Sequence, residues 1–187
     1  MSRQNLRNVL VIVVTTAVIL GGLWLLQKPW EAPAGVTAID VQVPAGQKAP
    51  AVGEAAPDFT ATTTAGAPVS LSGLRGQPVW LLFGATWCTE CRVEAPDVQA
   101  VATEFSGRVQ VMSVYVGEDT ATVQGYAGRV GLTYPQLADP TQAIAVQYAV
   151  MGIPAHYFIG ADGTIRKIAA GSLTPQAARE ALTGLGG

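Results

Sequence analysis

The chain contains few of the side chains that bind metals or nucleic acids. Its 187 residues include one histidine, His156, and only two cysteines, Cys88 and Cys91. A structural zinc site normally takes about four such ligands, so we expect neither a metal nor another cofactor. The formal net charge is -2, and lysine and arginine form no cluster after the first few residues. Nucleic acid is therefore not an expected partner, because the sequence predicts no basic surface for phosphates.

Charge is also absent from a long stretch near the N-terminus. Residues 9–26 carry no charged side chain, and a helix of that length, rising about 1.5 Å per residue, would span the apolar part of a bilayer. Arg3 and Arg7 precede this stretch. The positive-inside rule then predicts a cytoplasmic tail over residues 1–8 and a single transmembrane anchor over residues 9–26.

A cleaved signal peptide is the alternative to the anchor, because Ala32-Pro33-Ala34 loosely imitates a cleavage site. With either alternative, we expect the rest of the chain to lie outside the cytosol, on the periplasmic side of the bacterial cytoplasmic membrane.

The segment after the anchor differs in composition from the rest of the chain. Residues 27–53 are rich in alanine, proline, glycine and valine, which predicts a semi-extended linker. Alternating side chains over residues 36–43 also fit a short strand within it. Residues 54–187 then form the domain that carries the chemistry, and they are numerous enough to bury a core.

The pattern of this domain predicts an α/β fold. The apolar runs at residues 79–83 and 109–116 are typical of central strands covered on both faces. Turn residues between alternating runs predict two β-hairpins, and capping residues such as Asp119 and Thr174 predict helix starts. We expect a mixed central sheet with helices on both faces and the first hairpin as an N-terminal extension. The expected order is a hairpin over residues 58–71, a strand over 79–83, a helix over 89–105 that contains Pro96, a strand over 109–116, helices over 119–130 and 140–150, a hairpin over 155–168 and a helix over 174–182.

Both cysteines belong to one short motif, Trp87-Cys88-Thr89-Glu90-Cys91, which follows the first central strand. Backbone N–H groups and the dipole at the start of the next helix favour a thiolate, which predicts that Cys88 is the nucleophile. Cys91 comes one turn later and is expected beneath Cys88, where it can close a disulfide and release a bound partner. The charge of Glu90 partly offsets the effect of the helix. The motif thus predicts a thiol–disulfide redox centre.

Four motifs together resemble one known family. They are Ala56-Pro57-Asp58-Phe59, the cysteine motif, Arg92-Val93-Glu94-Ala95-Pro96 and Gly152-Ile153-Pro154. Through them, residues 54–187 resemble the membrane-anchored, thioredoxin-like proteins of the TlpA, ResA and CcmG group in the redoxin superfamily. The resemblance implies a thioredoxin-like fold and a protein thiol–disulfide oxidoreductase.

The resemblance also implies how a substrate binds. Pro154 matches a cis-proline that lies beside the dithiol, where an uncommon backbone geometry indicates a specific local role. The backbone of Gly152 and Ile153 would pair with an extended segment of the substrate. Trp87 either packs over the dithiol, where it would touch the substrate, or is a plain core aromatic.

Glu94 matches a glutamate that members of the family place near the thiols. Buried on the helix face of Cys91, it would favour its protonated form and could receive and return protons as the dithiol cycles. The alternative for Glu94 is a solvated helix carboxylate. His156 is expected as a structural strand residue, and contact with the substrate is the alternative.

As a function, the resemblance implies reduction of disulfides in partner proteins outside the cytosol, such as the haem-attachment cysteines of apocytochrome c in cytochrome c-type biogenesis. Because such compartments oxidise thiols, a membrane electron donor would have to reduce the enzyme again. Alternatively, the two thiolates bind Cu(I) in a copper chaperone or metal-site assembly factor. A peroxiredoxin-like peroxidase is a weaker alternative, because Leu81 and Ala85 occupy the positions of its usual proline and threonine or serine.

Overall fold

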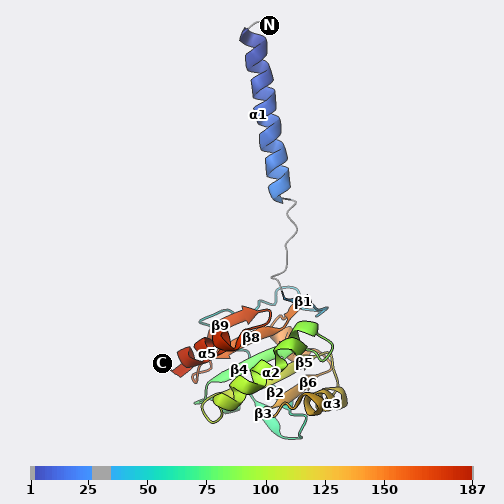
Figure 1. The fold of residues 1–187 in the computed structure, drawn as a ribbon, viewed down its shortest axis with the longest axis vertical. Coiled ribbons are helices and arrows are strands. Elements are labelled where there is room, and N and C mark those ends of the chain that lie inside the picture. The colour runs from blue at the N-terminus through green and yellow to red at the C-terminus, as the bar shows by residue number, and fades with distance from the viewer. Residues whose placement is uncertain (1–2, 27–34, 187) are drawn as a thin grey trace. The chain divides into compact units, whose positions relative to one another are not determined.

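The computed structural model describes residues 3–26 and 35–186, and the chain divides into two units, residues 1–32 and 33–187. In the first unit, helix α1 spans Arg3–Leu26 (Figure 1). Among the helices of the described residues, none combines the length and the apolar character needed to cross a membrane. The transmembrane anchor predicted over residues 9–26 is therefore not confirmed. Residues 1–2 of the predicted cytoplasmic tail and residues 27–34 of the predicted linker lie outside the described residues.

The second unit is built on a five-stranded mixed sheet with the strand order β6-β5-β4-β8-β9 (Figure 1). The central strand β4 is almost entirely buried, as an apolar run covered on both faces should be. On one side of β4 the sheet continues through parallel strands, and on the other side through antiparallel strands, so the predicted mixed sheet is confirmed. The strands are β4 (Val79–Gly84), β5 (Gln110–Val116), β6 (Gln136–Asp139), β8 (Ala155–Ile159) and β9 (Ile165–Ala170).

Helices cover both faces of this sheet, as predicted; α2 lies in front of the sheet in the view of Figure 1. On one face, α2 and α5 pack over a buried cluster that contains Trp80, Val101 and Phe158. On the other face, α4 and residues from the start of the unit cover a larger cluster around Phe83 and Tyr148. The helices of this unit are α2 (Thr89–Glu104), α3 (Thr120–Val130), α4 (Ala143–Gln147) and α5 (Pro175–Thr183), with the short 3-10 helices η1 (Ser72–Leu74) and η2 (Gly184–Gly186).

Local signals in the sequence place the ends of several elements correctly. The Asp119 carboxylate accepts a hydrogen bond from the Thr122 N–H at 2.9 Å and caps α3. Thr174 caps α5 in the same way, through the N–H of Ala177 at 3.2 Å. The predicted N-terminal hairpin is also confirmed, since β2 (Thr60–Thr62) and β3 (Pro68–Ser70) pair antiparallel.

Helix α4 is shorter than predicted, because it covers Ala143–Gln147 rather than residues 140–150. Gln142 has a left-handed backbone, with φ of 60°, so the helix cannot begin before it. The cap comes instead from Asp139, whose carboxylate accepts hydrogen bonds from the N–H groups of Ile144 at 3.1 Å and Ala145 at 2.9 Å.

The predicted linker over residues 27–53 also needs a correction, because its described part belongs to the second unit. Within it, β1 (Thr37–Ala38) pairs antiparallel with β7 (Gly152–Ile153), in the register Thr37 to Ile153. Val41 is only 3% exposed and belongs to the larger core cluster. The alternation that predicted a short strand here thus reflects burial of every second side chain against the domain.

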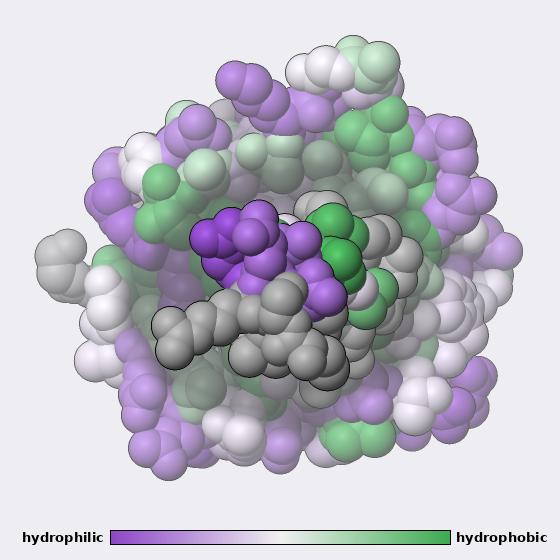
Figure 2. Space-filling model, turned by 90° about the horizontal axis from the view of Figure 1, so that it is seen from above, coloured by the Kyte–Doolittle hydropathy of each residue, from purple (hydrophilic) through white to green (hydrophobic). Residues whose placement is uncertain are grey.

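The surface of the second unit is chemically mixed. On the visible part of the face in Figure 2, hydrophilic and hydrophobic residues lie side by side. Large apolar side chains that are exposed singly are normal on a protein surface. Two of them, Trp87 and Met151, lie in sequence next to the predicted site residues Cys88 and Gly152.

Candidate active site

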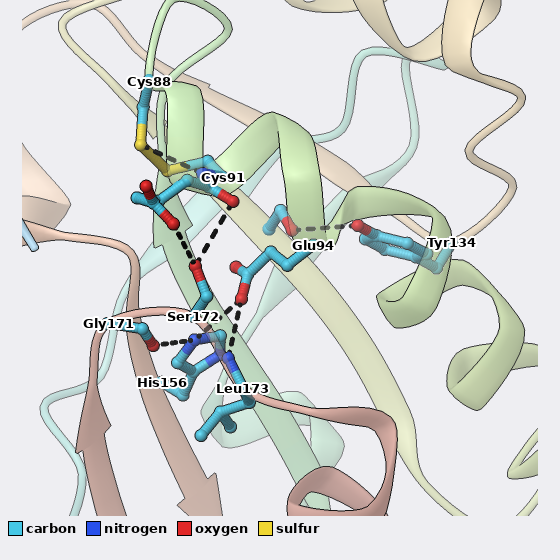
Figure 3. Close-up of polar contacts among 10 residues, drawn as sticks. Cys88, Cys91, Glu94, Tyr134, His156, Gly171, Ser172 and Leu173 are labelled. Carbon is cyan, nitrogen blue, oxygen red and sulfur yellow. Dashed lines mark hydrogen bonds and ion pairs between the residues drawn. A yellow bond between two sulfur atoms is a disulfide. The ribbon is translucent and has the colours of Figure 1, made fainter. Parts of the chain in front are cut away.

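The cysteine motif lies where β4 ends and α2 begins, as predicted. Cys88 is the N-cap residue of α2, and its Sγ accepts a hydrogen bond from the Cys91 N–H at 3.2 Å. The two cysteines form a disulfide, with their Cα atoms 5.3 Å apart (Figure 3). This geometry places Cys88 Sγ at the positive end of the helix dipole, where a thiolate is stabilised once the disulfide opens.

A carboxylate from the neighbouring strand end holds the loop before Cys88. Glu118 accepts hydrogen bonds from the Thr86 N–H at 2.7 Å and from the Thr86 hydroxyl at 2.5 Å. Glu118 was not predicted as a site residue. The available signal was its place just after β5, because parallel strands such as β4 and β5 end at the same edge of a sheet.

The exposure of the two cysteines reverses the predicted order. Cys88 is only 1% exposed, whereas Cys91, which was expected beneath it, is partly exposed. Cys91 Sγ lies against the backbone of Gly84, where an added Cβ would stand 3.4 Å away. Cys91 Sγ therefore packs closely beside Gly84 at the end of the central strand.

Glu94 is buried beneath the dithiol and is not the solvated carboxylate of the alternative interpretation. It is 5% exposed, and its Oε2 accepts a hydrogen bond from the Leu173 N–H at 3.1 Å. The same oxygen lies 3.5 Å from Nε2 of His156. Figure 3 shows the Glu94 side chain between Cys91 and His156.

His156 is a fully buried strand residue, which confirms its expected position in β8. Its Nε2 lies 3.1 Å from the carbonyl oxygen of Gly171, which can only accept, so Nε2 carries the proton and donates it. The contact of His156 with Glu94 was not predicted. It arises from the pairing of His156 with Leu82 across β4 and β8, a register that a single sequence does not reveal.

Cys91 and Glu94 line the same small cavity, of about 20 Å³, which is enough for roughly one water molecule. Tyr134 also lines it and receives a hydrogen bond from the Ser113 hydroxyl at 3.4 Å. Burial raises the pKa of Tyr134 to about 12, so its hydroxyl stays protonated near neutral pH. Glu94 is the carboxylate among the residues that line this cavity, so it can accept a proton there.

The remaining predicted residues lie at β7 and in the loop before α2. The Ile153–Pro154 peptide bond is cis, and Ile153 is fully buried. Gly152 and Ile153 form β7, but their partner strand is the chain's own β1. Trp87 is 54% exposed, so it is not a core aromatic. Within the described residues, no group of three or more histidine, cysteine, aspartate or glutamate side chains is arranged to hold a metal ion.

A disulfide at the start of a helix, with a cis-proline peptide immediately before strand β8 of the mixed sheet, defines a thiol–disulfide oxidoreductase of the thioredoxin-like fold. Comparison with known proteins agrees with this class. The chain belongs to the AhpC/TSA family, whose sequence profile matches residues 52–168.

Named relatives and solved structures support the same class of enzyme. The chain is 34% identical to the thiol-disulfide oxidoreductase ResA of Geobacillus kaustophilus over 127 residues. This alignment covers 67% of this chain and 73% of that protein. A secreted disulfide oxidoreductase of Mycobacterium tuberculosis is 29% identical with a TM-score of 0.63, covering 68% of this chain and 96% of that one. A putative thiol:disulfide interchange protein DsbE from Chlorobium tepidum is 25% identical with a TM-score of 0.69, covering 74% of this chain and 100% of that one.

Proposed function

We propose that the protein reduces disulfides of partner proteins outside the cytosol. The observation that carries this proposal is the Cys88–Cys91 pair at the start of α2, with the buried carboxylate of Glu94 lining a cavity together with Cys91. The disulfide supplies a two-electron centre, and the carboxylate supplies a proton acceptor beside the second sulfur.

The reaction begins with the reduced enzyme. The Cys88 thiolate attacks one sulfur of the partner disulfide, and the other partner sulfur leaves with the electron pair as a thiolate. Cys91 then attacks Cys88 Sγ, which forms the enzyme disulfide and releases the second partner thiolate. Two electrons pass to the partner, the one proton of Cys91 ends on one partner sulfur, and the other partner thiolate takes a proton from water.

Glu94 acts in the second step, because Cys91 must lose its proton before it attacks Cys88 Sγ. The carboxylate accepts that proton through the shared cavity and later returns it to a leaving thiolate. The Leu173 N–H holds Oε2 in place for this transfer. We propose Trp87, Gly152, Ile153 and Pro154 as the residues that contact the partner.

Two observations and one chemical argument support a reductant outside the cytosol. Arg3 and Arg7 precede the uncharged residues 9–26, a pattern typical of a membrane anchor. A relative named ResA and a structural neighbour named DsbE are thiol-disulfide enzymes. In an oxidising compartment, such an enzyme needs a membrane electron donor, and apocytochrome c with oxidised haem-attachment cysteines is a partner of suitable chemistry.

The reduction potential of Cys88 and Cys91, measured at equilibrium with glutathione, tests the direction of electron flow. A potential near about −270 mV or lower supports a reductant, and a potential near about −120 mV overturns it in favour of an oxidant. Reduction of insulin and of an oxidised apocytochrome c peptide by the reduced full chain tests the activity itself. If Cys88→Ser keeps that activity, the mechanism is wrong.

A further inference from the structure

The first described residues of the second unit form a strand that lies against the site. Thr37, Ile39 and Val41 point toward the protein and are at least partly buried, whereas Ala38 and Asp40 are exposed. This two-residue period is typical of a strand with one face buried. Residues 36–41 therefore pack on the domain rather than extend into solvent.

Backbone pairing places this segment on one specific edge. Thr37 pairs with Ile153 and Ala38 with Gly152, and the Ile39 N–H donates to the Met151 carbonyl oxygen at 3.1 Å. The segment thus occupies the edge of β7 immediately before the cis peptide at Pro154. This is the same edge on which an extended partner segment would have to pair.

The fit between the segment and β7 is close. A Cβ added to Gly152 would stand 2.5 Å from Cγ1 of Val36, so a side chain at this position would force Val36 to shift. At the other end, the Cβ position of Gly35 lies 3.9 Å from Oε2 of Glu90. Glu90 stands between the two cysteines, so the segment extends from the first turn of α2 along β7.

The nucleophilic cysteine is buried while the segment is in place. Cys88 is 1% exposed and shares its buried apolar cluster with Val41, and Ile39 packs against that cluster. Thiol–disulfide exchange requires a sulfur to reach the sulfur that it attacks. Cys88 must therefore become more accessible before a partner's sulfur can reach it.

We propose that the edge of β7 is a docking surface for one extended segment at a time, that residues 36–39 occupy it in the resting enzyme, and that a partner binds by replacing them. This inference rests on the proposed function, since it describes how the same site is opened. The occupant Val36-Thr37-Ala38-Ile39 is uncharged, and Glu90 lies at its N-terminal end. The fitting partner is an extended, non-acidic segment next to an accessible cysteine, added as a strand.

The test weakens the segment without changing the thiols. Ile39→Pro removes the N–H that donates to the Met151 carbonyl, and Ile39→Asp places a charge against the apolar cluster. Gln42→Pro is the matched control, because Gln42 is exposed. It is the middle residue of a tight turn, in which the Val43 N–H donates to the Val41 carbonyl oxygen at 2.9 Å, and this turn suits proline.

The measurements are the rate at which glutathione reduces the disulfide of the full chain, the rate at which the reduced chain reduces insulin, and the equilibrium constant with glutathione. Losing one backbone hydrogen bond in Ile39→Pro, or placing a charge against the apolar cluster in Ile39→Asp, should raise both rates by about 5- to 10-fold, with the equilibrium constant unchanged. The Gln42→Pro rates should match the wild type. Circular dichroism checks that each variant is folded. If Ile39→Pro does not fold, Ile39→Asp still tests the proposal.

The outcomes separate this inference from the proposed function. If the wild-type chain reduces insulin but the Ile39 variants are no faster than Gln42→Pro, the segment does not control access and the inference fails alone. A changed equilibrium constant without a rise in both rates also overturns it, because the segment would then change the reduction potential of the thiols rather than access to them. If the wild type exchanges no disulfide at all, the proposed function itself fails.

Discussion

The two cysteines of the motif lie in different surroundings, although only three positions separate them in the sequence. Cys88 is buried in the apolar cluster that contains Val41 and Phe83. Cys91 is partly exposed and lines the polar cavity of Glu94. The difference shows that access to the nucleophile and removal of a proton from the second sulfur depend on different parts of the fold, so substitutions can change one without the other.

Exchanging each cysteine for serine gives the largest expected effect. Cys88→Ser should abolish disulfide reduction, because the attacking sulfur is lost. Cys91→Ser should also stop turnover, but it should accumulate a covalent complex between Cys88 and the partner. Non-reducing gels and mass spectrometry after incubation with insulin measure this complex. Its appearance with Cys88→Ser instead would show that the roles of the two sulfurs are reversed.

Glu94→Gln should slow the release of the partner by about 100-fold, because general base catalysis at Cys91 is lost while the side-chain shape is kept. Stopped-flow measurement of mixed-disulfide decay checks this rate. Glu104→Gln is the matched control, since Glu104 lies at the other end of α2 in an exposed ion pair with Arg179. Equal decay rates in the two variants would remove Glu94 from the mechanism.

Alkaline pH should lower the free energy of unfolding by a moderate amount, through one tyrosine in the surroundings of each cysteine. Burial raises the pKa of Tyr134, near Glu94, and of Tyr157, in the cluster of Cys88, to about 12. An unfolded tyrosine ionises near pH 10, so stability that is complete below about pH 10 should be lost as pH rises to about 12.

Single phenylalanine variants separate the two tyrosines. At about pH 11, each ionisation should favour the unfolded state by roughly 1 kcal/mol. Denaturant unfolding measures each variant between about pH 9 and 12, the range in which tyrosine ionises. The free energy of unfolding should fall less steeply with pH in Tyr134→Phe and in Tyr157→Phe than in the wild type. An unchanged slope in either variant would mean that its tyrosine is not protected by burial.

The smallest expected effect is one of stability alone. Thr174→Ala removes the hydroxyl that caps α5 and should lower the free energy of unfolding by about 1 kcal/mol. Thr174→Ser keeps the hydroxyl and should stay close to the wild type. Urea unfolding measures both variants, and the rate of insulin reduction should not change in either. A slower reaction in Thr174→Ala would show that α5 affects the thiols.

Much of the fold follows from short-range signals, and the parts that do not are long-range. The β4 run, the Asp119 and Thr174 caps and the cysteine motif predict strands, helix starts and the site correctly, because each depends on neighbours within a few residues. The contact of His156 with Glu94 and the pairing of β1 with β7 depend on strand register between distant segments. No local pattern specifies that register. The sequence therefore predicts neither the contact of His156 with Glu94 nor the pairing of β1 with β7, and residues 27–53 are predicted as a linker.

One atom of the site has two functions. Cys88 Sγ exchanges electrons, and it also accepts the Cys91 N–H as the cap of α2. A thiolate is a stronger acceptor than a disulfide sulfur, so opening the disulfide strengthens this hydrogen bond rather than removing it. We therefore expect the start of α2 to be held in both oxidation states, so that electron transfer requires little reorganisation of the backbone.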